Sequence, residues 1–287
     1  MRQRRLLAGP AAAELVFVNG RFAPSLSRLG SLPPGLEAEP LHAVLGNRGA
    51  AVEARLGSLA PARTHAFTAL NTALFEDGAV ITVAPNALVD GVIHVVFVAD
   101  PPNGAAAIHP RLLVQVGSNA QVRLVESFYA ASDGEYFTNA VAEFDVADGA
   151  VVDHYKVQRE GRSAFHMGSL HVRCGRSSAF SSHSLSLGGA WVRNETSATL
   201  DDEGADCTLN GVYLGDGRTL VDNHTTIDHA KPHCTSHELY KGILGGVPVS
   251  RLLPDHTGLA GDIICAATEI NTDADRAAFA EALGSVL

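Results

Sequence analysis

A tight corner and an alternating strand follow one another in the stretch Ser118-Asn119-Ala120-Gln121-Val122-Arg123-Leu124-Val125-Glu126. Asn119 suits the corner because asparagine tolerates the left-handed backbone that a sharp turn requires. Side chains alternate between the two faces of a strand, so we expect Val122, Leu124 and Glu126 on one face and the residues between them on the other. The stretch therefore predicts a corner that leads into a β-strand.

The same kind of corner returns at a regular interval along the chain. A small or turn-forming residue marks each one, and the markers are Asn86, Asn119, Gly149, Ser178 and Gly204. Their separations are 33, 30, 29 and 26 residues, with no helical spacing between the strands. A meander or a sandwich would instead show turn signals every ~8–12 residues. The longer period predicts a mainly β chain coiled as a parallel β-solenoid, in which each coil pairs with the next.

We expect three parts along the chain. Residues 1–66 form an N-terminal cap of small α/β character, with a strand-turn-strand from Leu15 to Phe22 and a helix near residues 50–58. Residues 67–244 form the β-helix core. Residues 245–287 form an atypical C-terminal tail that ends in a helix with an apolar stripe. Both ends of a solenoid need such caps because their strand edges are otherwise open.

The composition favours a soluble, intracellular protein, and we expect a cytoplasmic location. Lys and Arg total 21 against 31 Asp and Glu, so the net charge is −10. An acidic surface argues against nucleic acid and against anionic membranes as partners, because both attract clustered cations. No apolar run approaches the ~20 residues that span a bilayer. The cysteines form no CxxC pair, and we expect reduced, mostly buried thiols at Cys174, Cys207, Cys234 and Cys265.

One segment is dense in potential metal ligands. It holds His224, His229, His233, Cys234 and His237, which are enough donors for zinc or iron. Their spacing matches no zinc-finger pattern, and a proline interrupts the strand geometry. The alternative is a structural polar ladder, in which the imidazoles form hydrogen bonds with neighbouring coils. Both interpretations stay open, and these side chains are the candidate metal ligands.

Known catalytic templates do not fit this chain, so we expect no catalytic residues and no enzyme. It contains no GxSxG elbow, no GxxxxGKS/T phosphate loop, no HExxH and no GxGxxG. A Cys234 nucleophile with His229 or His237 as its base lacks an identifiable third group to orient the base. The stretch Asp201-Asp202-Glu203 resembles carboxylate clusters that act on sugars, which leaves a β-helical polysaccharide-active enzyme as an alternative.

Several segments carry a family resemblance, which is most specific between Arg193 and Leu244. Three dipeptides, Leu70-Asn71, Tyr213-Leu214 and His233-Cys234, distinguish between branches of that family. The longer segments are Leu15-Val16-Phe17-Val18-Asn19-Gly20-Arg21-Phe22, Pro110-Arg111-Leu112-Leu113-Val114, Arg193-Asn194-Glu195, Asp222-Asn223-His224-Thr225 and Tyr240-Lys241-Gly242-Ile243-Leu244. Together they resemble the SufB/SufD family of the SUF iron–sulfur cluster assembly system over about residues 14–244. The dipeptides place the chain on the SufD-like side of that family.

This resemblance implies a right-handed parallel β-helix that acts as a non-catalytic scaffold. It implies pairing with a SufB-like subunit. Because exposed strand edges readily pair with other strands, we expect this contact at a β-helix edge near the C-terminal coil. It also implies that a SufC-like ATPase docks on the pair and supplies the hydrolysis of ATP. No cofactor is expected to bind tightly to this chain alone, because an iron–sulfur cluster would be held only transiently and together with the partner.

The chain departs from the family pattern at both ends, and we expect it to be truncated there. The family has a longer N-terminal helical region than the short segment that precedes Leu15. After Leu244 the family's remaining coils, its Cys-Ser-His segment and its C-terminal helical region are missing. This absence argues against docking of the SufC-like ATPase. From Gly246 onwards the sequence instead resembles the end of a glycine-cleavage P-protein subunit.

Overall fold

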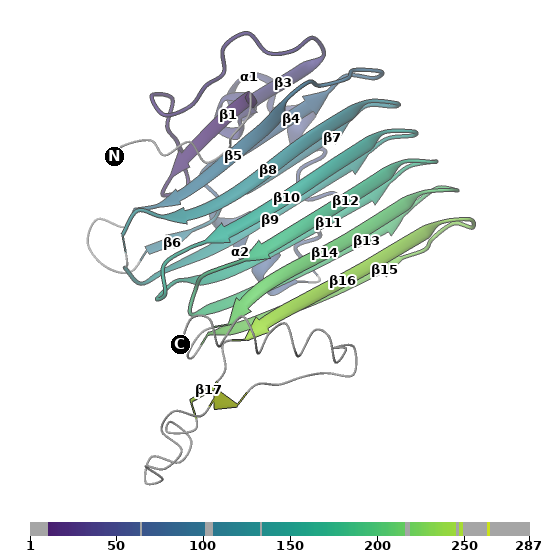
Figure 1. Cartoon of the computed structure of the whole chain (residues 1–287). Coiled ribbons are helices and arrows are strands. Elements are labelled where there is room, and N and C mark those ends of the chain that lie inside the picture. Colours follow the sequence, from purple (N-terminus) through teal and green to yellow (C-terminus); the bar gives the residue numbers. More distant parts are fainter. Residues whose placement is uncertain are drawn as a thin grey trace.

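The computed structural model describes residues 11–63, 65–100, 106–132, 134–215, 219–244, 247–248 and 263–264. Its strands stack like rungs, from β1 (Ala11–Val18) down to β15 (Leu220–Asp228) and β16 (Thr235–Leu244) (Figure 1). The mainly β, parallel β-helical fold expected from the sequence is confirmed. Two helices in the described residues, α1 (Leu41–Glu53) and α2 (Ala66–Leu74), lie beside this stack.

Two sheets form the walls of the solenoid. Sheet A has the order β16, β14 (Asp206–Gly215), β12 (Ala179–Ser186), β10 (Val151–Arg159), β8 (Gln121–Ala130), β5 (Val92–Ala99), β1 and β2 (Arg21–Phe22). Sheet B has the order β15, β13 (Trp191–Leu200), β11 (Phe165–Cys174), β9 (Tyr136–Val146), β7 (Arg111–Val116), β4 (Gly78–Val83) and β3 (Leu36–Pro40), with β6 (Ala106–Ile108) beside β9. Successive strands of the coils alternate between the sheets, so each coil adds one parallel strand to each wall.

Neighbouring coils stack in register through the middle of the solenoid. In sheet B, Val146 lies opposite Cys174, which lies opposite Leu200. In sheet A, Val152 lies opposite Phe180. All of these side chains are buried in one apolar cluster between the sheets. Each inward-facing position therefore forms a column of packed side chains along the solenoid, and the burial of these columns is the main contribution to stability.

A column of left-handed residues marks the corner that precedes the sheet A strands. The residues with positive φ there are Asn86, Asn119, Gly149, Ser177, Gly204 and His233. The corner expected at Ser178 is wrong by one residue, because it is Ser177 that has a φ of 50°. Backbone hydrogen bonds join the corners, as from the Ser177 N–H to the Glu203 carbonyl at 2.9 Å. At Asn119, Gly149 and Ser177 the residue with positive φ is the one whose N–H donates to the next corner. We infer that these bonds favour the left-handed conformation at that residue rather than at its neighbour.

The N-terminal segment contributes to the solenoid as well as to its cap. Strand β1 pairs in parallel with β5, so residues 11–18 extend sheet A. The expected strand-turn-strand is confirmed as β1 and β2, which Asn19 and Gly20 join with φ values of 50° and 78°. The helix expected near residues 50–58 lies earlier in the chain, as α1, and Arg48 interrupts it with a non-helical φ of −136°.

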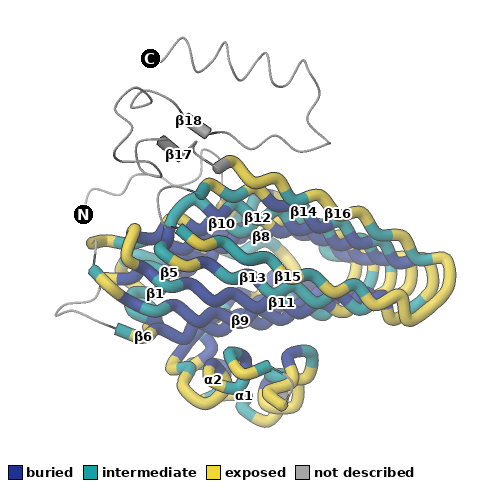
Figure 2. The backbone as a smooth tube through the Cα atoms, turned by 90° about the horizontal axis from the view of Figure 1, so that it is seen from below, coloured by how far each residue is buried: buried dark blue, intermediate teal, exposed yellow. Residues whose placement is uncertain are grey.

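Residues 66–74 form the helix α2, although the sequence analysis expected the β-helix core to begin at residue 67. The helix lies on the outer side of sheet B, next to β9 and β11 (Figure 2). Its Asn71 side chain is fully buried and donates to the carbonyls of Pro110 at 2.9 Å and Asn139 at 2.7 Å. Docking on the sheet therefore stabilises this helix, and the strands of the core resume at β4.

A buried ion pair holds the cap against sheet B. Arg111 on β7 and Glu143 on β9 are both fully buried, with 2.5 Å between Arg111 Nη2 and Glu143 Oε1. Arg111 also donates from Nη1 to Asn71 Oδ1 at 3.0 Å. Glu143 accepts from the backbone N–H groups of Gly57 at 2.8 Å and Ala60 at 3.1 Å. Each charge is thus paired and hydrogen-bonded, which a buried ion pair requires to be stable.

Beyond β16 the structure describes only β17 (Val247–Pro248) and β18 (Ile263–Ile264), which pair antiparallel. The helix expected at the end of the tail lies outside the described residues. Among the helices that the structure does describe, none is long and apolar enough to cross a bilayer. The division into residues 1–66, 67–244 and 245–287 stays a prediction.

Candidate functional site

The histidine-rich segment folds as the end of β15, a turn and the start of β16, which belong to different sheets. His224 lies on β15 in register with Glu195 of β13, and its Nε2 is 3.0 Å from Asp222 Oδ1. His237 lies on β16 in register with Thr208 of sheet A. The segment therefore divides its histidines between the two walls of the solenoid.

The turn holds the other predicted ligands. His229 Nε2 is hydrogen-bonded to Ser236 Oγ at 3.0 Å, and His233 is a corner residue with a φ of 61°. Cys234 donates from Sγ to the Asp202 carbonyl at 3.2 Å. Within the described ranges, no three His, Cys, Asp or Glu side chains already stand around a common metal position. The metal-binding role of this segment stays a prediction.

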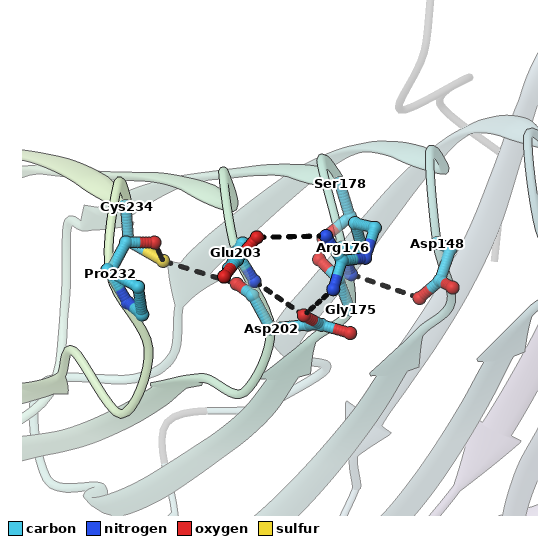
Figure 3. A network of polar contacts seen from close by, with 8 residues as sticks. All are labelled: Asp148, Gly175, Arg176, Ser178, Asp202, Glu203, Pro232 and Cys234. Carbon is cyan, nitrogen blue, oxygen red and sulfur yellow. Dashed lines mark hydrogen bonds and ion pairs between the residues drawn. The ribbon is translucent and has the colours of Figure 1, made fainter.

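Figure 3 shows the polar contacts between successive corners of the solenoid. Arg176 lies between two carboxylates of the next corner, 2.8 Å from Asp202 Oδ1 and 3.0 Å from Glu203 Oε2. The Arg176 backbone N–H donates to Asp148 Oδ1 at 3.0 Å. These pairs are exposed, so each contributes little to stability. The acidic stretch expected as a possible sugar site thus takes part in a chain of ion pairs along the corners.

Two cysteines are buried between the sheets. Cys174 and Cys207 are free thiols with no exposed surface, and burial raises the pKa of each to about 12. The thiolate is the nucleophilic and metal-binding form, so neither side chain offers it near neutral pH. Cys234 is half-buried, and Cys265 lies outside the described residues. The expectation of buried thiols is confirmed for the first two.

A polar group of side chains fills part of the space between the sheets. Lys156 on β10 donates to Asn194 Oδ1 on β13 at 2.8 Å, and burial lowers the Lys156 pKa to about 8. Gly168 leaves room for the ammonium, because a Cβ there would lie 2.1 Å from Lys156 Nζ. The adjoining cavity, lined also by Glu126 and Tyr240, measures about 20 Å³. That volume holds about one water molecule, so it is too small for an organic substrate.

A second polar group lies on the outer face of sheet B, beside the cap. We call it the outer-face cluster, and its members are His65, His171, Arg193, Glu195, Asp222 and His224. Arg193 donates to Glu195 Oε1 and to Asp222 Oδ2, both at 2.9 Å. The cluster combines imidazoles and carboxylates from the cap and three strands. Of its members the sequence analysis named only His224 as a candidate ligand, because His65, His171 and the pair Arg193 and Glu195 are far from it in the chain.

The last coil has two strand edges to which no other described strand pairs. Within the described residues, β15 pairs only with β13, and β16 pairs only with β14. Both strands expose apolar side chains, with 50% of Leu220, 51% of Leu239 and 54% of Ile243 accessible to solvent. An open edge presents a row of unpaired backbone N–H and C=O groups that another strand can complete. This end of the solenoid is therefore suited to contact with a protein.

Two family descriptions match the chain in succession. The SufBD core domain of SUF system FeS cluster assembly matches residues 97–251, and the SufBD protein N-terminal region matches residues 11–95. The chain belongs to the SufBD family. The family resemblance expected from the sequence is thus confirmed. The core match includes the coils from β7 to β16 and hence the open edge, the polar group between the sheets and most of the outer-face cluster.

Curated SufBD proteins are similar to this chain over part of their length. A SufBD family protein of Synechocystis sp. is 29% identical over 240 residues, which cover 81% of this chain and 53% of the relative. A SufBD family protein of Mycobacterium tuberculosis is 32% identical over 140 residues, covering 49% of this chain and 35% of the relative. SufD of Escherichia coli is 28% identical over 136 residues, which cover 47% of this chain and 32% of SufD. The chain thus spans about half the length, or less, of these relatives.

A short stretch is similar to a different kind of protein. Over 47 residues the chain is 64% identical to a probable glycine dehydrogenase (decarboxylating) subunit 1 of Azorhizobium caulinodans. The match covers 16% of this chain and 10% of that protein. It is the class of protein that the tail was expected to resemble.

Proposed function

We propose that this SufBD protein is a non-catalytic scaffold subunit in iron–sulfur cluster assembly, and that it pairs with a SufB-like subunit. The observation that carries the proposal is the edge of β15 and β16, which no other described strand pairs with, at the end of a long stack of parallel strands. The chain belongs to the SufBD family, whose core domain is described as part of SUF system FeS cluster assembly, and it is similar to SufD of Escherichia coli. Both findings support this role.

The edge of β16 has the properties of a pairing strand. All ten of its residues, Thr235–Leu244, pair with β14 without a register shift, so the strand has no bulge that would interrupt the row of backbone groups on its other side. Leu239 and Ile243 on the same strand expose apolar surface that a partner would bury. A strand of the SufB-like subunit that adds to this edge would satisfy the backbone groups and cover the apolar side chains together.

We assign ATP hydrolysis to a SufC-like ATPase and cluster formation to the pair rather than to this chain alone. The fully buried thiols Cys174 and Cys207, with pKa values raised to about 12, support the absence of a tightly bound cluster on this chain. An iron–sulfur cluster would be held transiently, with ligands that the partner supplies. Docking of the SufC-like subunit is tested by the same experiment as the pairing.

The test is co-expression with the SufB-like and SufC-like subunits of the same source, followed by affinity purification and size exclusion. The wild-type chain is expected to recover the SufB-like subunit, and recovery of the SufC-like subunit with it would show that the ATPase docks on the pair. A double variant, Leu239→Arg with Ile243→Arg, should lose the SufB-like subunit, because charge at a buried interface is costly. Leu88→Arg is the matched control, since Leu88 is 68% exposed and lies at a corner of sheet A away from the last coil.

Each outcome distinguishes parts of the proposal. Recovery of the SufB-like subunit without the SufC-like subunit would show that this chain does not bind the ATPase. Unchanged pairing in the double variant would refute the edge as the interface. A wild-type chain that emerges folded and alone would refute the scaffold role. The alternatives, a metal-binding segment at residues 224–237 and a polysaccharide-active enzyme, would then be tested first by metal analysis and by glycan binding.

A further inference from the structure

One inward-facing column of sheet B becomes polar as it approaches the last coil. It runs through Ala140, Gly168, Asn194 and Asn223, which lie opposite one another in register on β9, β11, β13 and β15. The two earlier residues carry a methyl group or no side chain, whereas the last two carry carboxamides. The column therefore ends in groups that form hydrogen bonds.

A chain of hydrogen bonds joins the two carboxamides to the buried ammonium of Lys156. Lys156 Nζ donates to Asn194 Oδ1 at 2.8 Å, and Asn194 Nδ2 donates to Asn223 Oδ1 at 3.0 Å. An ammonium group only donates, so it requires the oxygen of Asn194 on its side and the Asn194 amide nitrogen on the other. The chain therefore has one direction, and the next donor in it is the Asn223 Nδ2 group.

Asn223 lies at an edge to which no other described strand pairs. Within the described residues β15 pairs only with β13, and Asn223 Nδ2 donates to none of these residues. The residue is half-buried, so water can reach this donor in the isolated chain. A strand that adds to β15 would cover it.

Such a strand would place one of its residues directly opposite Asn223. Opposite residues of paired strands point to the same face of a sheet, with about 4.5–5.5 Å between their Cβ atoms in an antiparallel pair. An apolar side chain at that position would leave the Asn223 amide covered and unpaired, which is costly. A side-chain oxygen would instead accept its hydrogen bond.

Thr225 is the next inward-facing residue of β15, and it is already engaged within the last coil. Its Oγ1 donates to Glu238 Oε1 on β16 at 2.5 Å. Of these two side chains, it is therefore Asn223 that offers a donor to a neighbouring strand. A single buried asparagine fixes register and partner choice in coiled coils in a comparable way.

We propose that Asn223 selects the strand that pairs with β15, because the SufB-like subunit presents a side-chain oxygen opposite it. The chain of hydrogen bonds from Lys156 would then continue across the boundary into the partner. A slip of one residue would turn the partner's other set of alternate side chains towards the interior, so this contact also opposes wrong registers. The inference rests on the proposed pairing, and it adds the position and the chemistry of one contact.

The experiment measures the affinity of the full chain for the SufB-like subunit of the same source by isothermal titration calorimetry. Asn223→Leu keeps the approximate size of the side chain and removes the donor, so affinity should fall about tenfold. Asn223→Thr provides a hydroxyl at the same position and should regain most of that loss.

Thr226→Leu is the matched control on the same strand. Thr226 is exposed and points to the opposite face of β15 from Asn223, so its affinity should stay within about threefold of the wild-type value. Urea denaturation of each variant checks the fold. Asn194 Nδ2 lies 3.3 Å from Ser186 Oγ, so it keeps a partner when Asn223 is replaced. Asn223→Ala gives the same comparison if leucine disturbs the fold.

The outcomes separate this contact from the pairing itself. Unchanged affinity in Asn223→Leu, with pairing still lost in the Leu239→Arg, Ile243→Arg double variant, would overturn the role of Asn223 and leave the pairing intact. Equal losses in Asn223→Leu and Asn223→Thr, or in Asn223→Leu and Thr226→Leu, would overturn it as well, because hydrogen bonding would not be the cause. Absence of binding by the wild-type chain would overturn both proposals.

Discussion

Tyr240 of β16 lies across Gly211, its register partner on β14. A Cβ at Gly211 would come within 2.3 Å of the Tyr240 Cδ1 and Cε1 atoms. The reverse arrangement occurs two residues later, where Tyr213 lies over Gly242 and a Cβ would be 2.4 Å from its Cζ. Each ring covers the glycine of the neighbouring strand, which is a close approach that glycine permits. The two pairs hold the last coil against the one before it.

Gly211→Ala is therefore expected to destabilise the chain. The Tyr240 ring must move or the strands must separate, and overpacking of this kind costs about 1–3 kcal/mol. Urea denaturation measures the change in the free energy of unfolding. Gly30→Ala is the control, because nothing lies within 4 Å of a Cβ at Gly30. Equal stability of the two variants would contradict the close contact between Tyr240 and Gly211.

Glu143→Gln should be far more costly than Asp145→Asn on the same strand. Glu143 is fully buried, and its loss of charge leaves the guanidinium of Arg111 without a counter-charge, at about 3–5 kcal/mol. Asp145 has a side chain 33% exposed and pairs with Arg173, so its loss costs less than about 1 kcal/mol. Urea denaturation of both variants gives the comparison. Similar losses would show that the buried pair does not hold the cap.

The solenoid could be predicted because its corners and strands leave a periodic trace in the sequence. Asn86, Asn119, Gly149 and Gly204 adopt the left-handed conformation that their residue type favours. The error between Ser177 and Ser178 has a physical cause. Neither serine has an intrinsic preference that separates them, so the backbone hydrogen bonds to the next coil select the corner.

The parts that could not be predicted depend on contacts between distant elements. Arg111 and Glu143 stand on outward-facing positions of their strands, and only the docked cap buries them. Docking on sheet B also stabilises the helix α2. The sequence analysis missed this helix because the segments that follow it have a strand pattern. His65, His171 and Glu195 share no sequence motif, and they meet only because β11 and β13 stack in register beneath the cap. No linear signal could have grouped them.

Alkylation should distinguish the cysteines of the native chain. Cys174 and Cys207 are buried, and their pKa values, raised by burial to about 12, leave almost no thiolate at pH 8. Cys234 is half-buried and should react with iodoacetamide first among these three. Peptide mapping by mass spectrometry measures the order, and denaturant should equalise the rates. Rapid modification of Cys207 in the native chain would show that the last coils open readily.

The stability of the chain should rise with pH between about 8 and 9 because of Lys156. Burial lowers the Lys156 pKa from its ordinary value of 10.5 to about 8 in the folded chain. Above pH 8 the unfolded state therefore binds more protons than the folded state, so the free energy of unfolding increases with pH. The contribution of Lys156 alone has a slope that approaches about 1 kcal/mol per pH unit. The two buried thiols act in the opposite direction as the pH rises towards their unfolded pKa of 9.0, since their folded pKa values are raised to about 12, and near pH 9 they cancel the rise.

Lys156→Met should remove this rise, since methionine does not titrate and keeps much of the side-chain volume. Lys241→Met is the matched control, because Lys241 is exposed on β16 and should leave the pH dependence intact. Urea denaturation at pH 7.5, 8 and 9 gives the three profiles. If Lys156→Met keeps the wild-type slope, the ammonium between the sheets is hydrated well enough to titrate normally. The contact with Asn194 at 2.8 Å would then not isolate it from solvent.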